Sequence, residues 1–284
     1  MWIPLALLSA LLWAGSSLVD KLAVDRGYRT LELLPATYTA GFLVVAFRHQ
    51  GVAELWRWRY LLSGMLLAFF SLLNSFALLM ALRCGEVAMV SVVAGSHCVI
   101  TAVAATLMLG ERLSTSQWLA VLLSVAGVCL VFGIRQAWLL AQRRNRQKPS
   151  YRWFWLALLA AVGSSGETIG LKMATAICAG GQYSLIWEYF IASLVLHGLV
   201  ATYRVRLRLR SSLFGLGDGV LTGLGMLTFG AALCEGPASL VATVATAAVL
   251  FRALGGIVFF GDRAGRGQWL GFGLLCLAFL LIRW

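Results

Sequence analysis

Three charged or titratable side chains stand deep inside apolar stretches of this sequence, and they are the residues best placed to do chemistry. They are Glu167, His97 and Arg252. If each stretch crosses a bilayer as a helix rising about 1.5 Å per residue, all three lie within about 5 Å of the bilayer centre. A charge at that depth costs about 3 kcal/mol or more when unpaired. We therefore expect these side chains to be paired or to line a polar cavity.

Glu167 and His97 are the candidates for proton coupling. A carboxylate in a cavity could exchange a proton near neutral pH or bind a cationic group, whereas a structural Glu167 would form a static ion pair with a neighbouring helix. His97 could relay a proton, or its imidazole could be satisfied by a backbone carbonyl. Arg252 could bind an anionic substrate group or pair with Asp218. The sequence leaves each of these alternatives open.

Aromatic and amide side chains extend the set of candidate cavity residues. Aromatic rings could stack on a planar or cationic ligand, or they could belong to an interfacial aromatic belt. An amide in an apolar layer must find a partner, so it either joins helices or lines a cavity. The full set of predicted substrate-binding residues is Trp13, Tyr38, Asn74, His97, Glu167, Trp187, Glu188, Tyr189 and Arg252.

Lys172 shares an apolar stretch with Glu167 but lies nearer its end. The two residues are about 140° apart around a helix, so they do not pair along one face. A lysine at this depth can extend its amine toward the membrane surface. We expect interfacial anchoring, rather than substrate contact, for Lys172 and for Lys21.

Long apolar runs must position these side chains. The chain has 284 residues, of which 61% are hydrophobic and only 12% are charged, and its mean hydropathy is +0.87. Each run is close to the roughly 20 residues that cross a bilayer as a helix. The sequence predicts an all-α polytopic membrane protein with ten transmembrane helices, over residues 2–24, 31–47, 60–82, 87–109, 117–134, 153–177, 185–203, 213–233, 238–260 and 267–284.

Several functional classes lack their sequence signals. The net charge of +12 comes from basic residues between the apolar runs, where they meet lipid headgroups, so no nucleic-acid partner is expected. No H-E-x-x-H, G-x-S-x-G or P-loop pattern occurs, and the three histidines are scattered. The six cysteines show no C-x-x-C spacing. We expect no catalytic residues, no metal and no cofactor.

The two halves of the sequence repeat at an offset of 151 residues. "LALLSALLWAGSSLVDKLA" aligns with "LALLAAVGSSGETIGLKMA", and "GERLSTSQWL" aligns with "GDRAGRGQWL". Because five spans are an odd number, the second repeat must enter the membrane in the opposite sense to the first. We expect repeats at residues 1–135 and 153–284, joined by a basic loop at 136–152.

The ten spans, the repeat, and the "LGER" and "FGDR" turns before "QWL" together resemble the drug/metabolite transporter superfamily, EamA type. The resemblance implies a secondary transporter that moves a small organic metabolite by alternating access, with protons as a potential coupling ion. It also implies an integral protein of the cell membrane, expected to be the bacterial inner membrane. The alternative is a flippase, or an accessory subunit, for a lipid-linked sugar or headgroup.

Two further patterns concern packing and orientation. Gly215, Gly219 and Gly223 have the four-residue spacing that lets another helix backbone approach closely. Most of the 23 lysines and arginines fall in connections that share one membrane side, which the positive-inside rule assigns to the cytoplasm. Both termini would then face outward, whereas the resembling family usually keeps its termini cytoplasmic. The sequence leaves the orientation open.

Overall fold

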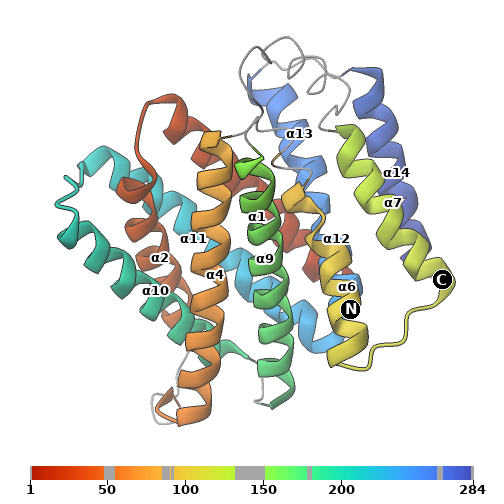
Figure 1. The fold of residues 1–284 in the computed structure, drawn as a ribbon, viewed down its shortest axis with the longest axis horizontal. Coiled ribbons are helices and arrows are strands. Elements are labelled where there is room, and N and C mark those ends of the chain that lie inside the picture. Colours follow the sequence, from red (N-terminus) through yellow and green to blue (C-terminus); the bar gives the residue numbers. More distant parts are fainter. Residues whose placement is uncertain are drawn as a thin grey trace. The chain divides into compact units, whose positions relative to one another are not determined.

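All regular secondary structure that the described residues form is α-helical (Figure 1). The computed structural model describes residues 2–47, 55–84, 90, 93–131, 151–177, 181–260 and 265–282. The helices are α1 (Trp2–Asp25), α2 (Thr30–Phe47), α4 (Trp58–Cys84), α6 (His97–Met108), α7 (Thr115–Val131), α9 (Arg152–Ile177), α10 (Gln182–Thr202), α11 (Leu209–Glu235), α12 (Ala238–Ala245), α13 (Ala247–Phe260) and α14 (Arg266–Ile282).

Six of these helices are long and apolar enough to cross a membrane, namely α1, α2, α4, α9, α10 and α11. Four shorter apolar segments, Val93–Met108, Thr115–Val131, Ala238–Arg252 and Arg266–Ile282, coincide with the remaining predicted spans. Large apolar side chains are exposed along most helices; Leu107 and Leu209, for example, are each 79% exposed. Exposed apolar surface of this extent suits contact with lipid, so the chain is an integral membrane protein.

The chain divides into two packing units, and both take helices from both halves of the sequence. The first unit comprises residues 1–71 and 170–236, and the second comprises 72–169 and 237–284. The predicted connecting loop at 136–152 lies outside the described residues up to position 150.

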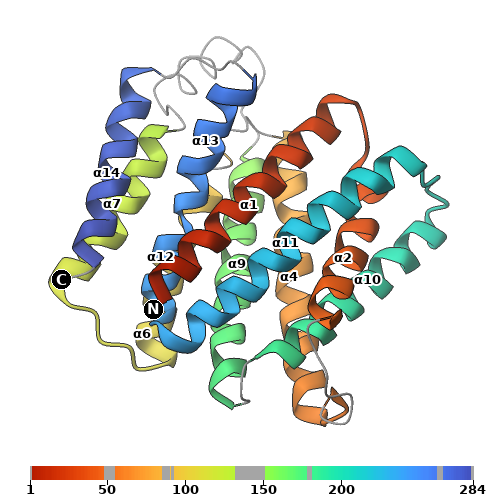
Figure 2. The same cartoon turned by 180° about the vertical axis from the view of Figure 1, so that it is seen from behind.

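In the first unit, α11 packs along both α1 and α2, and α10 packs on α2. Figure 2 shows α1 and α11 lying side by side. A Cβ at Gly215 would lie 2.5 Å from the Leu33 carbonyl oxygen, and one at Gly223 would lie 3.1 Å from Gly41 Cα. A Cβ at Gly219 would likewise overlap the Thr37 carbonyl oxygen. The predicted close approach along the glycine stripe is therefore confirmed, and its partner is the backbone of α2.

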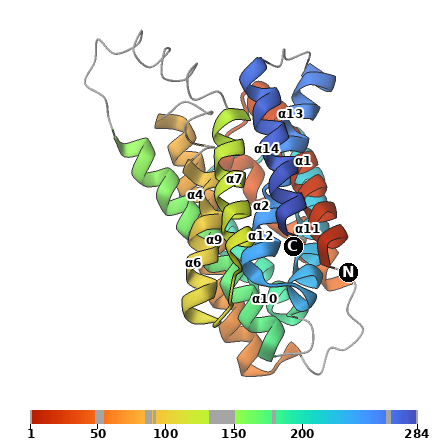
Figure 3. The same cartoon turned by 90° about the vertical axis from the view of Figure 1, so that its right-hand side faces the viewer.

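In the second unit, α7 packs against α14 and α6 packs against α12. Figure 3 shows α7 and α14 side by side. A Cβ at Gly127 would lie 3.0 Å from the Gly271 carbonyl oxygen, and one at Gly267 would lie 4.0 Å from that of Leu130. This pairing order shows that α7 and α14 are antiparallel, so they begin at opposite ends of the unit.

The residues of the repeated "GER" and "QWL" motifs act at helix ends. Gly110 ends α6 with φ 67°, a left-handed conformation that glycine adopts without strain. The Glu111 carboxylate then accepts hydrogen bonds from the backbone N–H groups of Ala238, at 2.6 Å, and Ser239, at 3.2 Å. These are the first two N–H groups of α12, which have no partner within the helix. The Ser239 hydroxyl also donates to Glu111.

The glutamine of each "QWL" motif closes the start of its helix in the same way. Gln117 Oε1 accepts from the Ser114 N–H at 3.0 Å, and Gln268 Oε1 accepts from the Gly265 N–H at 2.8 Å. Ser114 and Gly265 are equivalent under the sequence repeat. At α7, the Ser114 hydroxyl also accepts from the Gln117 N–H at 3.3 Å, which completes a capping box.

Candidate functional site

Two apolar segments of the second unit are interrupted by a hydroxyl residue. The segment Val93–Met108 is interrupted at Ser96, whose N–H and Oγ both donate to the Val93 carbonyl, at 3.2 and 2.7 Å. The segment Ala238–Arg252 is interrupted between α12 and α13 at Thr246. There the N–H and Oγ1 donate to the Thr243 carbonyl at 3.2 and 2.6 Å. A side-chain bond to the carbonyl three residues back competes with the regular helical bond and tightens the turn.

The two interruptions occupy nearly corresponding places in the sequence repeat. Both residues keep helical dihedrals, φ −69° and ψ −1° at Ser96 and φ −62° and ψ −12° at Thr246, so each interruption is a single tightened turn. These interruptions could not be predicted from the sequence, because no proline marks them. The signals that could have found them are the pair Gly95–Ser96 in one segment and the paired threonines Thr243 and Thr246 in the other.

His97 directly follows the first break. Its Nδ1 lies 3.2 Å from the Ala94 carbonyl oxygen and is assigned as the donor, which is the backbone-satisfied alternative left open by the sequence. The Ser165 hydroxyl of α9 donates to the His97 carbonyl at 2.9 Å. Among the described residues, no hydrogen bond reaches His97 Nε2.

The other predicted residues of this unit lie on three helices. Asn74 is half-buried on α4, Glu167 on α9 and Arg252 on α13. The positive charge of Arg252 lies close enough to His97 to act on its imidazole electrostatically. Glu167 and Arg252 both interact with other groups, as expected for charges at this depth.

The remaining five predicted residues lie in the first unit, where two of them form one cluster. Tyr38 of α2 and Tyr189 of α10 have ring centroids 5.6 Å apart, and both are almost fully buried. The Tyr38 hydroxyl lies 2.9 Å from Ser71 Oγ. Next to this pair, Thr39 Oγ1 lies 2.9 Å from Ser193 Oγ. Phe42 and Phe190 have ring centroids 5.5 Å apart, so this contact and the Thr39–Ser193 contact follow opposite orders along the two helices. The helices α2 and α10 are therefore antiparallel neighbours joined by polar as well as aromatic contacts.

Trp187, Glu188 and Trp13 have other surroundings. The Trp187 Nε1–H donates to the Leu55 carbonyl at 2.9 Å, so this ring holds the segment before α4. Glu188 is 0% exposed, and it interacts with other groups. Trp13 of α1 packs on Phe229 of α11 with ring centroids 5.0 Å apart.

Two charged residues of the first unit have structural partners that the sequence did not reveal. The Lys172 amine donates to the carbonyls of Leu233, at 2.5 Å, and Gly236, at 2.8 Å. It thus caps the C-terminal end of α11, where positive charge is favourable. The buried Asp218 carboxylate accepts from the hydroxyls of Ser16, at 2.5 Å, and Thr222, at 3.4 Å. Asp218 was not among the predicted site residues.

The predicted site residues therefore fall into two groups. Trp13, Tyr38, Trp187, Glu188 and Tyr189 belong to the first unit, and Asn74, His97, Glu167 and Arg252 belong to the second. The second group includes His97, directly after the tightened turn at Ser96, and carries titratable side chains of both charge types. The first group supplies buried aromatic rings and a buried carboxyl group.

Comparison with known proteins gives a family and a fold. The sequence profile of the EamA-like transporter family matches residues 1–133. A protein of known crystal structure superposes with a TM-score of 0.81 over 99% of this chain and 98% of its own, at 16% identity. That likeness shows the fold alone, and 28 chains of solved structures match in all. No curated protein sequence matches the chain significantly.

Proposed function

Because the chain is a member of the EamA-type drug/metabolite transporters, we propose that it is a secondary transporter that moves a small organic metabolite by alternating access. The family supplies the general class, a membrane transporter of small solutes. The proposal adds the mechanism, a central binding site that opens to each side in turn, and the bacterial inner membrane as its location.

The observation that carries the proposal is the pair of interrupted helices. Transporters commonly bind substrate or coupling ions where two corresponding helices are broken near the middle of the membrane. Here the tightened turns at Ser96 and Thr246 have the same hydrogen-bond pattern, and a histidine follows one of them.

The antiparallel helix pairs support the ten-helix inverted repeat that this mechanism needs. Under the offset of 151 residues, α2 corresponds to α10 and α7 corresponds to α14. Each pair is antiparallel and in direct contact. Two similar five-helix repeats threaded in opposite senses would give each helix this relation to its counterpart.

Glu167 and His97 are the residues we propose for proton coupling. Both lie in the second unit, and among the described residues the hydrogen bond of the His97 ring is made by Nδ1. A carboxyl group and an imidazole can each carry a proton between the two faces of a transporter during its cycle.

Two measurements on the full-length protein test the proposal. Thermal-shift screening against metabolite pools would first identify a stabilising solute, because a ligand that binds the folded state raises its apparent stability. Uptake of that solute into proteoliposomes, with and without an imposed pH gradient, would then be compared for wild type and Glu167→Gln. We expect the variant to fold but to lose the response to the gradient.

Glu235→Gln is the matched control, because Glu235 is exposed at the end of α11. It should leave uptake unchanged. If Glu167→Gln transports like wild type at every pH, Glu167 has no part in coupling. If no solute from the screen is transported down its own gradient, the transporter proposal itself fails.

A further inference from the structure

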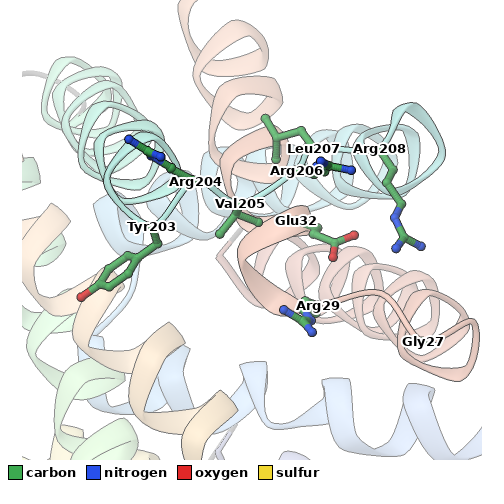
Figure 4. A pocket seen from close by; sticks show the side chains of 9 residues that line it. All are labelled: Gly27, Arg29, Glu32, Tyr203, Arg204, Val205, Arg206, Leu207 and Arg208. Carbon is green, nitrogen blue, oxygen red and sulfur yellow. The ribbon is translucent and has the colours of Figure 1, made fainter.

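A pocket of about 760 Å³ lies at one end of the first unit, between the α1–α2 connection and the α10–α11 connection (Figure 4). Its lining is strongly basic. The polar side chains that surround it are Arg29, Glu32, Tyr203, Arg204, Arg206 and Arg208. The four arginines are all exposed, so their guanidinium groups can reach a ligand from the solvent or the membrane surface.

Glu32 is the unusual member of this lining. It is only 6% exposed, and no described residue donates a hydrogen bond to its Oε2. Figure 4 shows its carboxylate pointing into the space among the arginine side chains. A buried carboxylate oxygen without a donor is costly, and this acceptor lies in a pocket that is also lined by four exposed arginines.

The buried carboxylate and the arginines together restrict which ligands the pocket can bind. A simple anion such as phosphate would be attracted by the arginines but repelled by Glu32. A ligand that carries both a phosphate and an N–H-bearing cation would satisfy both. Guanidinium groups match phosphate oxygens, and an ammonium group would donate to the carboxylate.

The pocket lies where lipid headgroups are found. It is formed at the start of α2, the end of α10 and the start of α11, which are three helices long and apolar enough to cross the membrane. Tyr203 and Leu209 beside it are 69% and 79% exposed, as expected for side chains at the boundary between headgroups and acyl chains. Basic pockets between transmembrane helices are known to bind lipid headgroups.

The backbone of the pocket is itself unusual. Arg204 has φ 50°, and it is the only non-glycine residue among those described with a positive φ. It follows the C-terminus of α10, where the Val205 N–H donates to the Val200 carbonyl at 3.0 Å and the Arg204 N–H donates to Ala201 at 3.3 Å. This is the bond pattern of a Schellman motif, whose left-handed position is usually glycine. An arginine held there despite the strain points to a use for its side chain.

We propose that this pocket binds a phosphoethanolamine group, with the phosphate held by the arginines and the primary ammonium held by Glu32. The membrane lipid phosphatidylethanolamine and a soluble phosphoethanolamine ester both present this group. Binding at this pocket goes beyond the proposed transport function. It is measured as lipid binding rather than as solute uptake, so it can be tested even if the transport proposal fails.

Native mass spectrometry of the full-length protein in detergent tests the proposal. Equimolar phosphatidylethanolamine, phosphatidylcholine and phosphatidylglycerol with identical acyl chains are added in competition. Phosphatidylcholine has the same charges but no N–H on its cation, and phosphatidylglycerol has no cation. We expect phosphatidylethanolamine to be preferred over both by about tenfold, the value of one charge-assisted hydrogen bond.

Three variants locate the binding. Glu32→Gln should reduce the preference for phosphatidylethanolamine over phosphatidylcholine to about one. The double variant Arg206→Gln/Arg208→Gln should weaken binding of all three lipids by about tenfold or more. Arg210→Gln, an exposed arginine of the same basic segment that does not line the pocket, should leave binding unchanged.

Free O-phosphoethanolamine distinguishes the two sources. If it fails to displace the lipid at millimolar concentration, the ligand is the lipid; if it displaces the lipid at equal concentration, the ligand is the soluble ester. Equal binding of phosphatidylethanolamine and phosphatidylcholine by wild type would overturn the proposal, as would a preference for phosphatidylglycerol alone. Neither result depends on whether a variant folds.

Discussion

Individual residues explain why the sequence repeat keeps its polar matches. The glycine and glutamate of "LGER" end α6 and cap α12, and the glutamine of each "QWL" closes the start of its helix. The repeat was visible in the sequence because these residues recur at one offset. Their roles were not, because a capped helix such as α12 can lie more than a hundred residues away from the capping side chain.

Glu111 is the clearest test of these caps. Glu111→Ala removes a carboxylate that accepts from two backbone N–H groups and one hydroxyl of α12. We expect the free energy of unfolding to fall by about 2–3 kcal/mol, and by about half as much for Glu111→Gln. Denaturation in mixed detergent micelles measures the change. The neighbouring Arg112→Gln, at an exposed position, should change stability little.

Arg204 should respond in the opposite direction. Its left-handed conformation costs an L-residue about 1–2 kcal/mol, and glycine removes that cost while adding some freedom to the unfolded chain. Arg204→Gly is therefore expected to raise the free energy of unfolding by about 0.5–1 kcal/mol. Arg206→Gly, in the same connection but without a positive φ, should not stabilise the protein. A loss of stability in Arg204→Gly would mean that the side chain is bound more tightly than described.

At the scale of the element, the α2–α11 contact shows what helical spacing could and could not predict. The spacing of Gly215, Gly219 and Gly223 predicted a surface for close backbone approach, and this is confirmed. The identity of the partner could not be predicted, because several apolar helices of similar composition could have filled the stripe. Periodicity describes a surface and says nothing about which neighbour covers it.

Gly219→Ala tests the closeness of that contact. The added methyl group would overlap the Thr37 carbonyl oxygen, and both atoms belong to helix backbones that cannot yield independently. We expect a loss of about 2–3 kcal/mol of stability. Gly217→Ala, two residues earlier on the same helix and with nothing within 4 Å of the new methyl group, is the control. Equal effects of the two substitutions would contradict this account of the contact.

The tightened turns at Ser96 and Thr246 were the element-level feature that could not be predicted from the sequence. Residues 87–109 and 238–260 were each predicted as one uninterrupted span. Hydropathy averages over a window, so one serine or threonine that bonds its own backbone leaves the average unchanged. The break depends on which carbonyl the hydroxyl reaches, and that is decided by the rotamer and the local backbone together.

At the scale of the whole molecule, the membrane class followed from the sequence, whereas the grouping of site residues did not. Long apolar runs and low charge suffice to predict an α-helical membrane protein, because hydrocarbon admits few alternatives. Which candidate side chains meet is set by helix rotation, and a turn of about 100° moves a residue from one neighbour to the next. Tyr38 and Tyr189 contact each other, whereas the Lys172 amine donates to carbonyls at the C-terminal end of α11.

The proposed inverted repeat makes a direct prediction about topology. Thr115 and Arg266 are both exposed and are equivalent at the repeat offset, each being the first residue of its helix. In a background without the six native cysteines, Thr115→Cys and Arg266→Cys should react with a membrane-impermeant maleimide from opposite sides of the membrane. Labelling from the same side would exclude oppositely threaded repeats. The side that labels Arg266→Cys would also settle the orientation of the termini.

The contact between α7 and α14 joins counterparts of the two halves, and so does the contact between α2 and α10. Each half of the chain therefore covers helix surfaces that the other half alone would leave exposed. A fragment ending at residue 135 would keep α2 and α7 but lack α10 and α14, which pack on them. A second copy of the fragment would supply its own α2 and α7 in place of α10 and α14. Expressed alone, such a half-length chain should be isolated as a homodimer.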